Sequence, residues 1–238
     1  MVEHRTFNAV VAGSSPARLT IFIAIAVLLF LSPQDCFQPP PKTPRPPFST
    51  INGCDNILFV ASRNINDLVV GMRPNAQELL AKCLSKGVEM RPSQTVRTPL
   101  EQAKLWRQSR TRSDIVAQIN RFHLDGAEFL AFCLDSVGPQ SGDPVTNAPP
   151  GLSWHQWGEA MDCFWVVDGS AEWSTRRLVA GVNGYQVYAE EAKRLGLTPG
   201  GYFRSLKDWP HVQLRTDGSP LGPLTIVEID REMKARFG

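Results

Sequence analysis

The chain lacks any marked excess of charge of one sign, because 25 lysines and arginines nearly balance 23 aspartates and glutamates over 238 residues. A formal net charge of +2 is too small to indicate nucleic-acid binding by itself. No internal repeat is apparent, and histidine is scarce, with four in the whole chain. The length allows one or two domains, but the N-terminal fifth is unsuited to a hydrophobic core, so we expect one folded domain.

The N-terminal segment contains one continuous apolar run, from Ile21 to Leu31, preceded by Arg5 and Arg18. This order resembles the charged and hydrophobic regions of a secretory signal, although the run is short for a membrane span and no convincing cleavage site follows. We therefore expect residues 1–35 to be a signal peptide or a membrane anchor, and the domain to be exported, either periplasmic or attached to the membrane. The proline-rich stretch that follows predicts an extended linker over residues 36–54.

Five cysteines in an exported chain permit disulfides. Cys36 lies in the leader or linker, so the other four allow three complete pairings. We expect Cys54 to pair with Cys83, and Cys133 with Cys163.

Two short segments supply candidate metal ligands. His155 and Asp162 lie seven positions apart across Gly158, and His211 follows Asp208 by three positions. Two histidines and one carboxylate around Zn²⁺ leave a fourth position free for water, as expected of a catalytic rather than a structural zinc site.

The local sequence predicts how these side chains point. Residues 160–167 are rich in aromatic and β-branched types and predict a strand, on which Asp162 faces a cleft and the adjacent Cys163 faces away. A second strand starting at His211 places His211 and Gln213 on one face. Cys163 is therefore rejected as a zinc ligand.

Each residue alone also has a structural interpretation, since a lone His or Asp near a strand is more often a hydrogen-bonded structural group. Four tryptophans surround the proposed ligands and fit either the dry wall of a cleft or simple core packing: Trp154, Trp157, Trp165 and Trp209. His123 is far from both segments and is interpreted as a helix-end or surface histidine.

The combined pattern S-x-H-x-x-G-x-A-x-D, followed some fifty residues later by D-x-x-H, resembles the zinc D-alanyl-D-alanine carboxypeptidases and L-alanyl-D-glutamate endopeptidases of bacteria and their phages. These enzymes share a compact fold with the zinc domain of hedgehog proteins. The resemblance extends upstream through residues 95–106 and 145–153 and covers about residues 55–216.

The resemblance implies roles for further residues. Arg97 matches the arginine that binds the substrate carboxylate, whereas without the resemblance a surface salt bridge is the favoured interpretation. Gln102 and Ser153 match polar residues of the cleft. Asp208 matches the general base, where many members have Glu and the endopeptidase branch usually has Asp.

The implied reaction is hydrolysis of a peptide bond in peptidoglycan stem peptides by zinc-activated water. L-alanyl-D-glutamate endopeptidase activity is the leading expectation, with D-alanyl-D-alanine carboxypeptidase activity as the alternative. A non-catalytic, zinc-stabilised wall-binding domain is the alternative of another class. We expect a monomer whose partner is the stem peptide, with possible membrane attachment through the N-terminal segment and no nucleic-acid partner.

The scaffold is predicted to be α+β, with a small antiparallel sheet flanked by helices and the zinc site in a cleft on the sheet. The expected helices run from Asn75 to about Lys86, from Thr98 onward behind a capping box, from Gly126 to Val137 and from Tyr185 to Leu195. Pro92 makes residues 88–96 irregular or an edge strand. The zinc domain should span residues 55–216, followed by an extension over 217–238 that contains a short amphipathic helix. The basic run from Lys104 to Arg112 is interpreted as a solvated helix end.

Overall fold

The computed structural model describes residues 61–204 and 206–238. The described residues form one compact unit. The expected export segment, the proline-rich linker and Cys54 lie outside the described residues. Among the helices that are described, none combines the length and apolar character needed to cross a bilayer.

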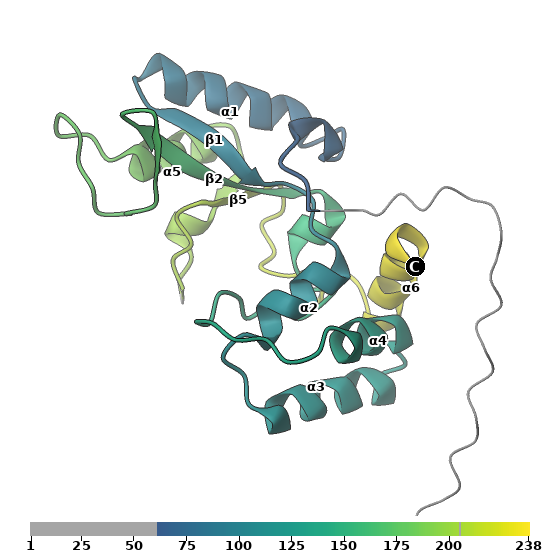
Figure 1. The fold of residues 1–238 in the computed structure, drawn as a ribbon. Helices are drawn as coiled ribbons and strands as arrows, with labels where there is room; N and C mark the ends of the chain where they lie inside the picture. Colours follow the sequence, from purple (N-terminus) through teal and green to yellow (C-terminus); the bar gives the residue numbers. More distant parts are fainter. Residues whose placement is uncertain (1–60, 205) are drawn as a thin grey trace, which may run out of the picture. The chain divides into compact units, whose positions relative to one another are not determined.

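The described residues form an α+β fold, which confirms the expected class (Figure 1). The helices are α1 (Arg73–Ser85), α2 (Pro99–Arg107), α3 (Arg112–Leu124), α4 (Glu128–Ser136), α5 (Gly184–Arg194) and α6 (Ile226–Phe237). The strands are β1 (Glu89–Gln94), β2 (Ala160–Val167), β3 (Ser170–Glu172), β4 (Thr198–Pro199) and β5 (His211–Gln213). Three short 3₁₀ segments complete the set: η1 (Ile65–Asp67), η2 (Trp154–Trp157) and η3 (Gly200–Tyr202).

The sheet is antiparallel with strand order β1-β2-β5-β4, and β3 pairs with the far end of β2. β1 lies at an edge, and its pairing with β2 is irregular between Pro92 and Gln94, as expected for a strand that contains a residue without an N–H donor. β2 and β5 pair so that Asp162 lies opposite His211. This register brings residues separated by 49 positions directly beside each other.

Two hydrophobic cores hold the fold together. The first lies between one face of the sheet and helices α1 and α5, and it contains Met161, Cys163 and Trp165 of β2. The second is built from α2, α3, α4, α6 and the tryptophans of η2. In Figure 1 α1 runs along the sheet, while α2, α3, α4 and α6 gather beyond its end. The opposite face of β2, which carries Asp162, is therefore directed away from the first core.

The helix predictions need correction at the starts of two helices and for one missed helix, and α4 begins at Glu128 rather than Gly126. The first helix begins at Arg73 rather than Asn75, because Pro74 occupies its first turn, where no N–H donor is needed. Helix α3 was not expected, since its start falls within the run interpreted as a solvated helix end. The run is in fact divided between the end of α2 and the start of α3, where Thr111 and Asp114 form a capping box.

The predicted disulfide between Cys133 and Cys163 is wrong, because both thiols are free and buried. Cys83 is also a free, buried thiol. Burial raises the pKa of Cys83 and of Cys133 to about 12, so neither thiol ionises at neutral pH.

Candidate metal centre

Three different elements deliver the candidate ligands. His155 lies in η2, Asp162 in β2 and His211 in β5. Gly158 follows η2 in the left-handed conformation, with φ of 69°, and this turn leads the chain from His155 directly into β2. The antiparallel register then places His211 beside Asp162.

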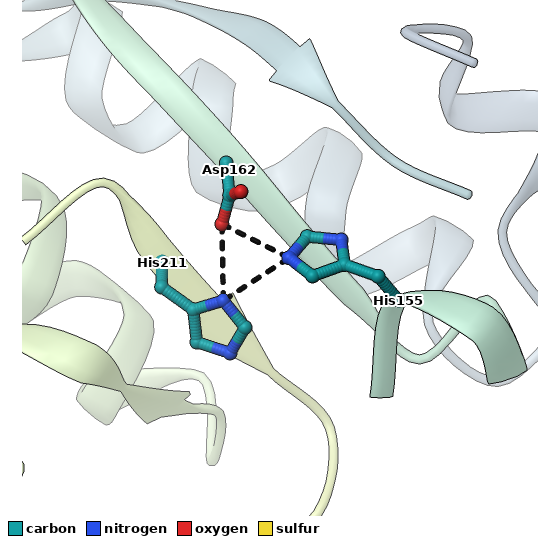
Figure 2. A group of neighbouring side chains, drawn as sticks. All are labelled: His155, Asp162 and His211. Carbon is teal, nitrogen blue, oxygen red and sulfur yellow. Dashed lines mark hydrogen bonds and ion pairs between the residues drawn. The ribbon is translucent and has the colours of Figure 1, made fainter. Parts of the chain in front are cut away.

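The three side chains converge on one point, as Figure 2 shows. The carboxylate Oδ1 of Asp162 lies 3.1 Å from His155 Nε2 and 3.0 Å from His211 Nδ1. The two ring nitrogens are 3.2 Å apart. Ligand atoms about 2.0–2.2 Å from one tetrahedral zinc ion would be separated by roughly 3.3–3.6 Å, so a small outward adjustment accommodates the ion.

The outer nitrogen of each imidazole has its own partner, and this fixes which nitrogen faces the centre. His155 Nδ1 lies 2.8 Å from the carbonyl oxygen of Thr95, so Nδ1 carries the proton and donates it. His211 Nε2 lies 3.0 Å from Gln213 Oε1. The Gln213 amide nitrogen donates to the carbonyls of Arg215 and Asp217, at 2.7 and 2.8 Å, which leaves Oε1 facing the imidazole. Such support by outer hydrogen bonds is typical of metal-binding histidines.

The charges within the centre favour an ionised carboxylate. Burial alone would raise the pKa of Asp162, but the charge and hydrogen bonds of His155 and His211 hold it well below its usual value. Burial lowers the pKa of His155. The pKa of His211 is raised: burial opposes protonation, but the hydrogen bond and charge of Asp162 outweigh it. The donor set of one carboxylate and two imidazoles therefore suits a divalent cation.

Asp208 lies beside the three ligands but outside their cluster. Its N–H donates to the carbonyl of Gly200 at 3.0 Å, and its own carbonyl accepts from the N–H of His211 at 3.1 Å. The side chain still reaches solvent. Desolvation by the surrounding protein raises the pKa of Asp208, and the negative charge of Asp162 raises it further. This is the environment of a carboxylate that can exchange protons near the metal site.

Two glycines hold the turn that carries Asp208, a feature that the sequence interpretation missed. A Cβ on Gly200 would lie 2.4 Å from the carbonyl oxygen of Asp208. A Cβ on Gly201 would lie 2.4 Å from the ring of Trp209. The Gly-Gly pair in front of the D-x-x-H motif was the available signal.

Arg97 is buried beside the metal centre, so the alternative of a surface salt bridge is wrong. Its Nη2 lies 3.5 Å from Asp162 Oδ2, and its guanidinium also donates to Gln94. Gln102 is fully buried and accepts from Arg97 Nη1 at 2.8 Å. The side-chain amide of Gln102 in turn donates to the carbonyl of Ala148 at 2.6 Å. Gln102 thus holds Arg97 in place.

The remaining candidate residues have simpler positions. Ser153 is half-buried at the N-cap of η2, two residues before His155. His123 is exposed on α3 and lies 2.9 Å from Glu128, which fits a surface histidine. The four tryptophans around the site pack in or against the two cores: Trp154, Trp157, Trp165 and Trp209.

Three known proteins are similar to this chain in sequence or in structure. The chain is 27% identical over 152 residues to the peptidoglycan L-alanyl-D-glutamate endopeptidase CwlK of Bacillus subtilis (strain 168). The aligned region covers 63% of this chain and 74% of CwlK. The L-Ala D-Glu endopeptidase ChiX of Serratia marcescens is similar in structure, with 17% identity, a TM-score of 0.33 and coverage of 66% of this chain and 89% of ChiX. A zinc(II) complex of a variant of the vancomycin-resistance D,D-pentapeptidase VanY, from a VanB-type resistance cassette, has 15% identity and a TM-score of 0.36 and covers 71% and 78% of the two chains. The model of the VanY family, described as D-alanyl-D-alanine carboxypeptidase, matches residues 67–198, more than half of the chain, and the chain therefore belongs to this family.

Proposed function

We propose that the protein is a zinc metallopeptidase that cleaves peptidoglycan stem peptides, with the bond between L-alanine and D-glutamate as its target. The observation that carries this proposal is the convergence of His155, Asp162 and His211 with the carboxylate of Asp208 beside them. A purely structural site does not need that additional carboxylate. The identity to CwlK supports the choice of bond.

Zinc fits this site because both imidazoles present a single unprotonated nitrogen and the carboxylate is ionised. When bound, zinc acts as a Lewis acid that lowers the pKa of a coordinated water to about 7 and polarises the scissile carbonyl.

The chain's own residues would move the proton and orient the substrate. Asp208 accepts a proton from the attacking water and returns it to the leaving amine, so it must be ionised in the resting enzyme. Arg97 directs its guanidinium to a substrate carboxylate, because Gln94 and Gln102 hold it in a fixed orientation at the edge of the centre. Ser153, at the N-cap of η2 and two residues before His155, is a further candidate for contact with the substrate.

A second candidate within the same enzyme class is D-alanyl-D-alanine carboxypeptidase activity, which the description of the matching family favours. Both reactions use the same metal centre and differ in the position of the scissile bond along the stem peptide. Mass spectrometry of muropeptides after incubation separates them, because loss of one terminal alanine identifies the carboxypeptidase and release of the peptide beyond L-alanine identifies the endopeptidase.

The decisive experiment replaces Asp208 by asparagine. Muropeptide hydrolysis should fall by about 10²–10⁴-fold, while zinc content and thermal stability stay near those of the wild type. Asp143→Asn, at an exposed position, is the matched control and should keep full activity. Full activity of Asp208→Asn would exclude Asp208 as the base. A zinc-loaded wild type that cleaves no stem-peptide bond would favour the wall-binding alternative.

The ligand assignment has its own test. His155→Ala combined with His211→Ala removes both nitrogen ligands, so the zinc content should fall from about one equivalent to near zero. His123→Ala is the control because its side chain is exposed and pairs with Glu128. Normal zinc content in the double variant would rule out this site.

We also propose that the domain acts outside the cytoplasm, since the apolar run Ile21 to Leu31 follows basic residues. A C-terminal reporter that is active only in the cytoplasm should stay silent in the producing cell. A bright signal would overturn export.

A further inference from the structure

The face of β2 that carries the metal ligand continues into an aromatic side chain. Side chains alternate along a strand, and Met161, Cys163 and Trp165 all lie in the first core. Asp162 and Phe164 therefore share the opposite face. Phe164 is half-buried and lies two residues beyond the metal ligand.

Trp173 extends this aromatic surface. It directly follows β3, whose register pairs Glu172 with Trp165, so the next position along the strand direction falls opposite Phe164. The two rings are 5.6 Å apart between centroids and tilted by 42°. Trp173 is 55% exposed, whereas the other five of the six tryptophans are buried or half-buried. We call Phe164 and Trp173 the aromatic platform.

A cation borders the platform. Arg91 on β1 is the Cα partner of Phe164, so it lies on the other side of the phenyl ring from Trp173. The Arg91 side chain is exposed and pairs with Glu89 at 2.6 Å. An aromatic surface edged by hydrogen-bond donors suits a ligand with one apolar face and several polar groups, which describes a sugar ring.

The spacing along β2 between Asp162 and Phe164 agrees with a sugar bound next to the bond between L-alanine and D-glutamate. Two residues of a strand span about 7 Å. In peptidoglycan, a lactyl group and one L-alanine separate the muramyl ring from the bond to D-glutamate, and two such units span at most about 7 Å. The bond between the terminal D-alanines lies three residues further along the stem peptide, which would place the sugar roughly 10 Å further away in an extended peptide.

We propose that Phe164 and Trp173 bind the muramyl sugar next to the scissile bond. This inference rests on the proposed function and deepens it, because it makes the substrate a glycan-linked stem peptide rather than a free peptide. The sugar stacks on the exposed face of Trp173 while Arg91 donates to its polar substituents.

Activity on two matched substrates tests the proposal. Trp173→Ala should lower kcat/KM for a disaccharide-linked stem peptide by at least about tenfold, the loss typical of a contact that binds strongly. The same variant should keep the wild-type kcat/KM on the stem peptide without sugar. Trp173→Phe, which retains an aromatic ring, should recover most of the loss. Phe132→Ala is the control, because Phe132 is similarly exposed, at 58%, on α4.

An equal loss on both substrates would overturn the proposal and assign Trp173 to the peptide or to the fold. An unchanged kcat/KM on both would also overturn it.

Binding separates this proposal from the proposed function. Zinc-loaded Asp208→Asn, titrated calorimetrically with the disaccharide-linked peptide, should bind it, and the added Trp173→Ala substitution should weaken binding about tenfold. That result would support the sugar site even if the wild type hydrolysed no peptide. Equal affinity with and without Trp173 would refute the sugar site whatever the activity of the wild type.

Discussion

At the scale of single residues, Gln213 fixes which imidazole nitrogen of His211 is available to a metal ion. Its amide nitrogen is held by the carbonyls of Arg215 and Asp217, so its oxygen accepts the Nε2 proton of His211. The free lone pair of the imidazole is thereby kept on Nδ1, which faces Asp162 and His155.

Gln213→Leu should consequently weaken zinc binding by about 10–100-fold, as expected for loss of an outer hydrogen bond to a ligand. Competition with a chromophoric chelator measures the change. Gln186→Leu, at an exposed position on α5, should bind zinc as the wild type does. Unchanged affinity in Gln213→Leu would show that His211 keeps its orientation without the amide.

The sequence indicated the three ligand candidates because their spacing and the period of two along a strand are local properties. The alternation that put His211 and Gln213 on one face also holds in the structure. The orientation of the Gln213 amide depends on two carbonyls in the following loop, and the burial of Arg97 depends on Gln94 and Gln102. Such contacts follow only from the folded arrangement.

At the scale of elements, the close approach of η3 to the turn before β5 leaves no room for a side chain. Gly200→Ala would bring a methyl group against the carbonyl oxygen of Asp208 and the Cβ of His211. We expect a loss of about 1–3 kcal/mol in the free energy of unfolding, as for other overpacked sites, together with weaker zinc binding. Gly218→Ala is the control, because nothing lies within 4 Å of its added Cβ. Denaturant unfolding of the metal-free proteins measures the loss of stability. Equal stability of Gly200→Ala and Gly218→Ala would show that the contact with Asp208 leaves room for a methyl group.

Helix α6 begins with a capping box that makes its stability depend on pH. The backbone N–H and the hydroxyl of Thr225 donate to Glu228 and lower its pKa below the ordinary 4.5. A carboxylate with a depressed folded-state pKa contributes stability above its unfolded pKa, and this contribution is lost as the pH falls through the folded value. Glu228→Gln should therefore be less stable than the wild type at pH 7, and the deficit should shrink below pH 4. Glu232→Gln, later in the helix, should show a smaller deficit at pH 7, and equal deficits in the two variants would argue against the cap.

Several elements followed from sequence because their signals are short-range. The strand predicted over residues 160–167 coincides with β2, and the capping box at Thr98 starts α2. Helix α3 was missed because its first residue continues a basic run, and only the short segment from Gln108 to Thr111 separates it from α2. Whether two cysteines pair depends on how far apart their elements lie in the fold, and their spacing in the sequence does not determine this distance.

At the scale of the whole molecule, α6 is part of the second core. Ile229 and Met233 are fully buried there, and Asp230 accepts from the backbone N–H of Leu130 at 2.8 Å. A Cβ on Gly151 would lie 2.8 Å from Ile229, so the loop before η2 packs tightly against this helix.

Ile229→Ala should therefore reduce the free energy of unfolding by about 2–5 kcal/mol, the range for truncating a large buried side chain. Val227→Ala is the control, since Val227 is 44% exposed on the same helix. Urea unfolding measures both, and a cost below 1 kcal/mol for Ile229→Ala would mean that α6 is only loosely attached.

The candidate ligands stand on elements that belong to both cores, so a bound ion would have a mechanical role in addition to a chemical one. His155 stands on η2, whose tryptophans are anchored in the second core, while Asp162 and His211 stand on strands that pack on the first. An ion bound by all three ligands would therefore link the two cores. Zinc that binds the folded chain and not the unfolded chain would raise the free energy of unfolding by RT ln(1 + [L]/Kd), where [L] is the free zinc concentration and Kd the dissociation constant of the site. Removal of the ion would then remove the link between the two cores, so we expect the metal-free protein to unfold, and to be cut by proteases, more readily than the metal-bound protein.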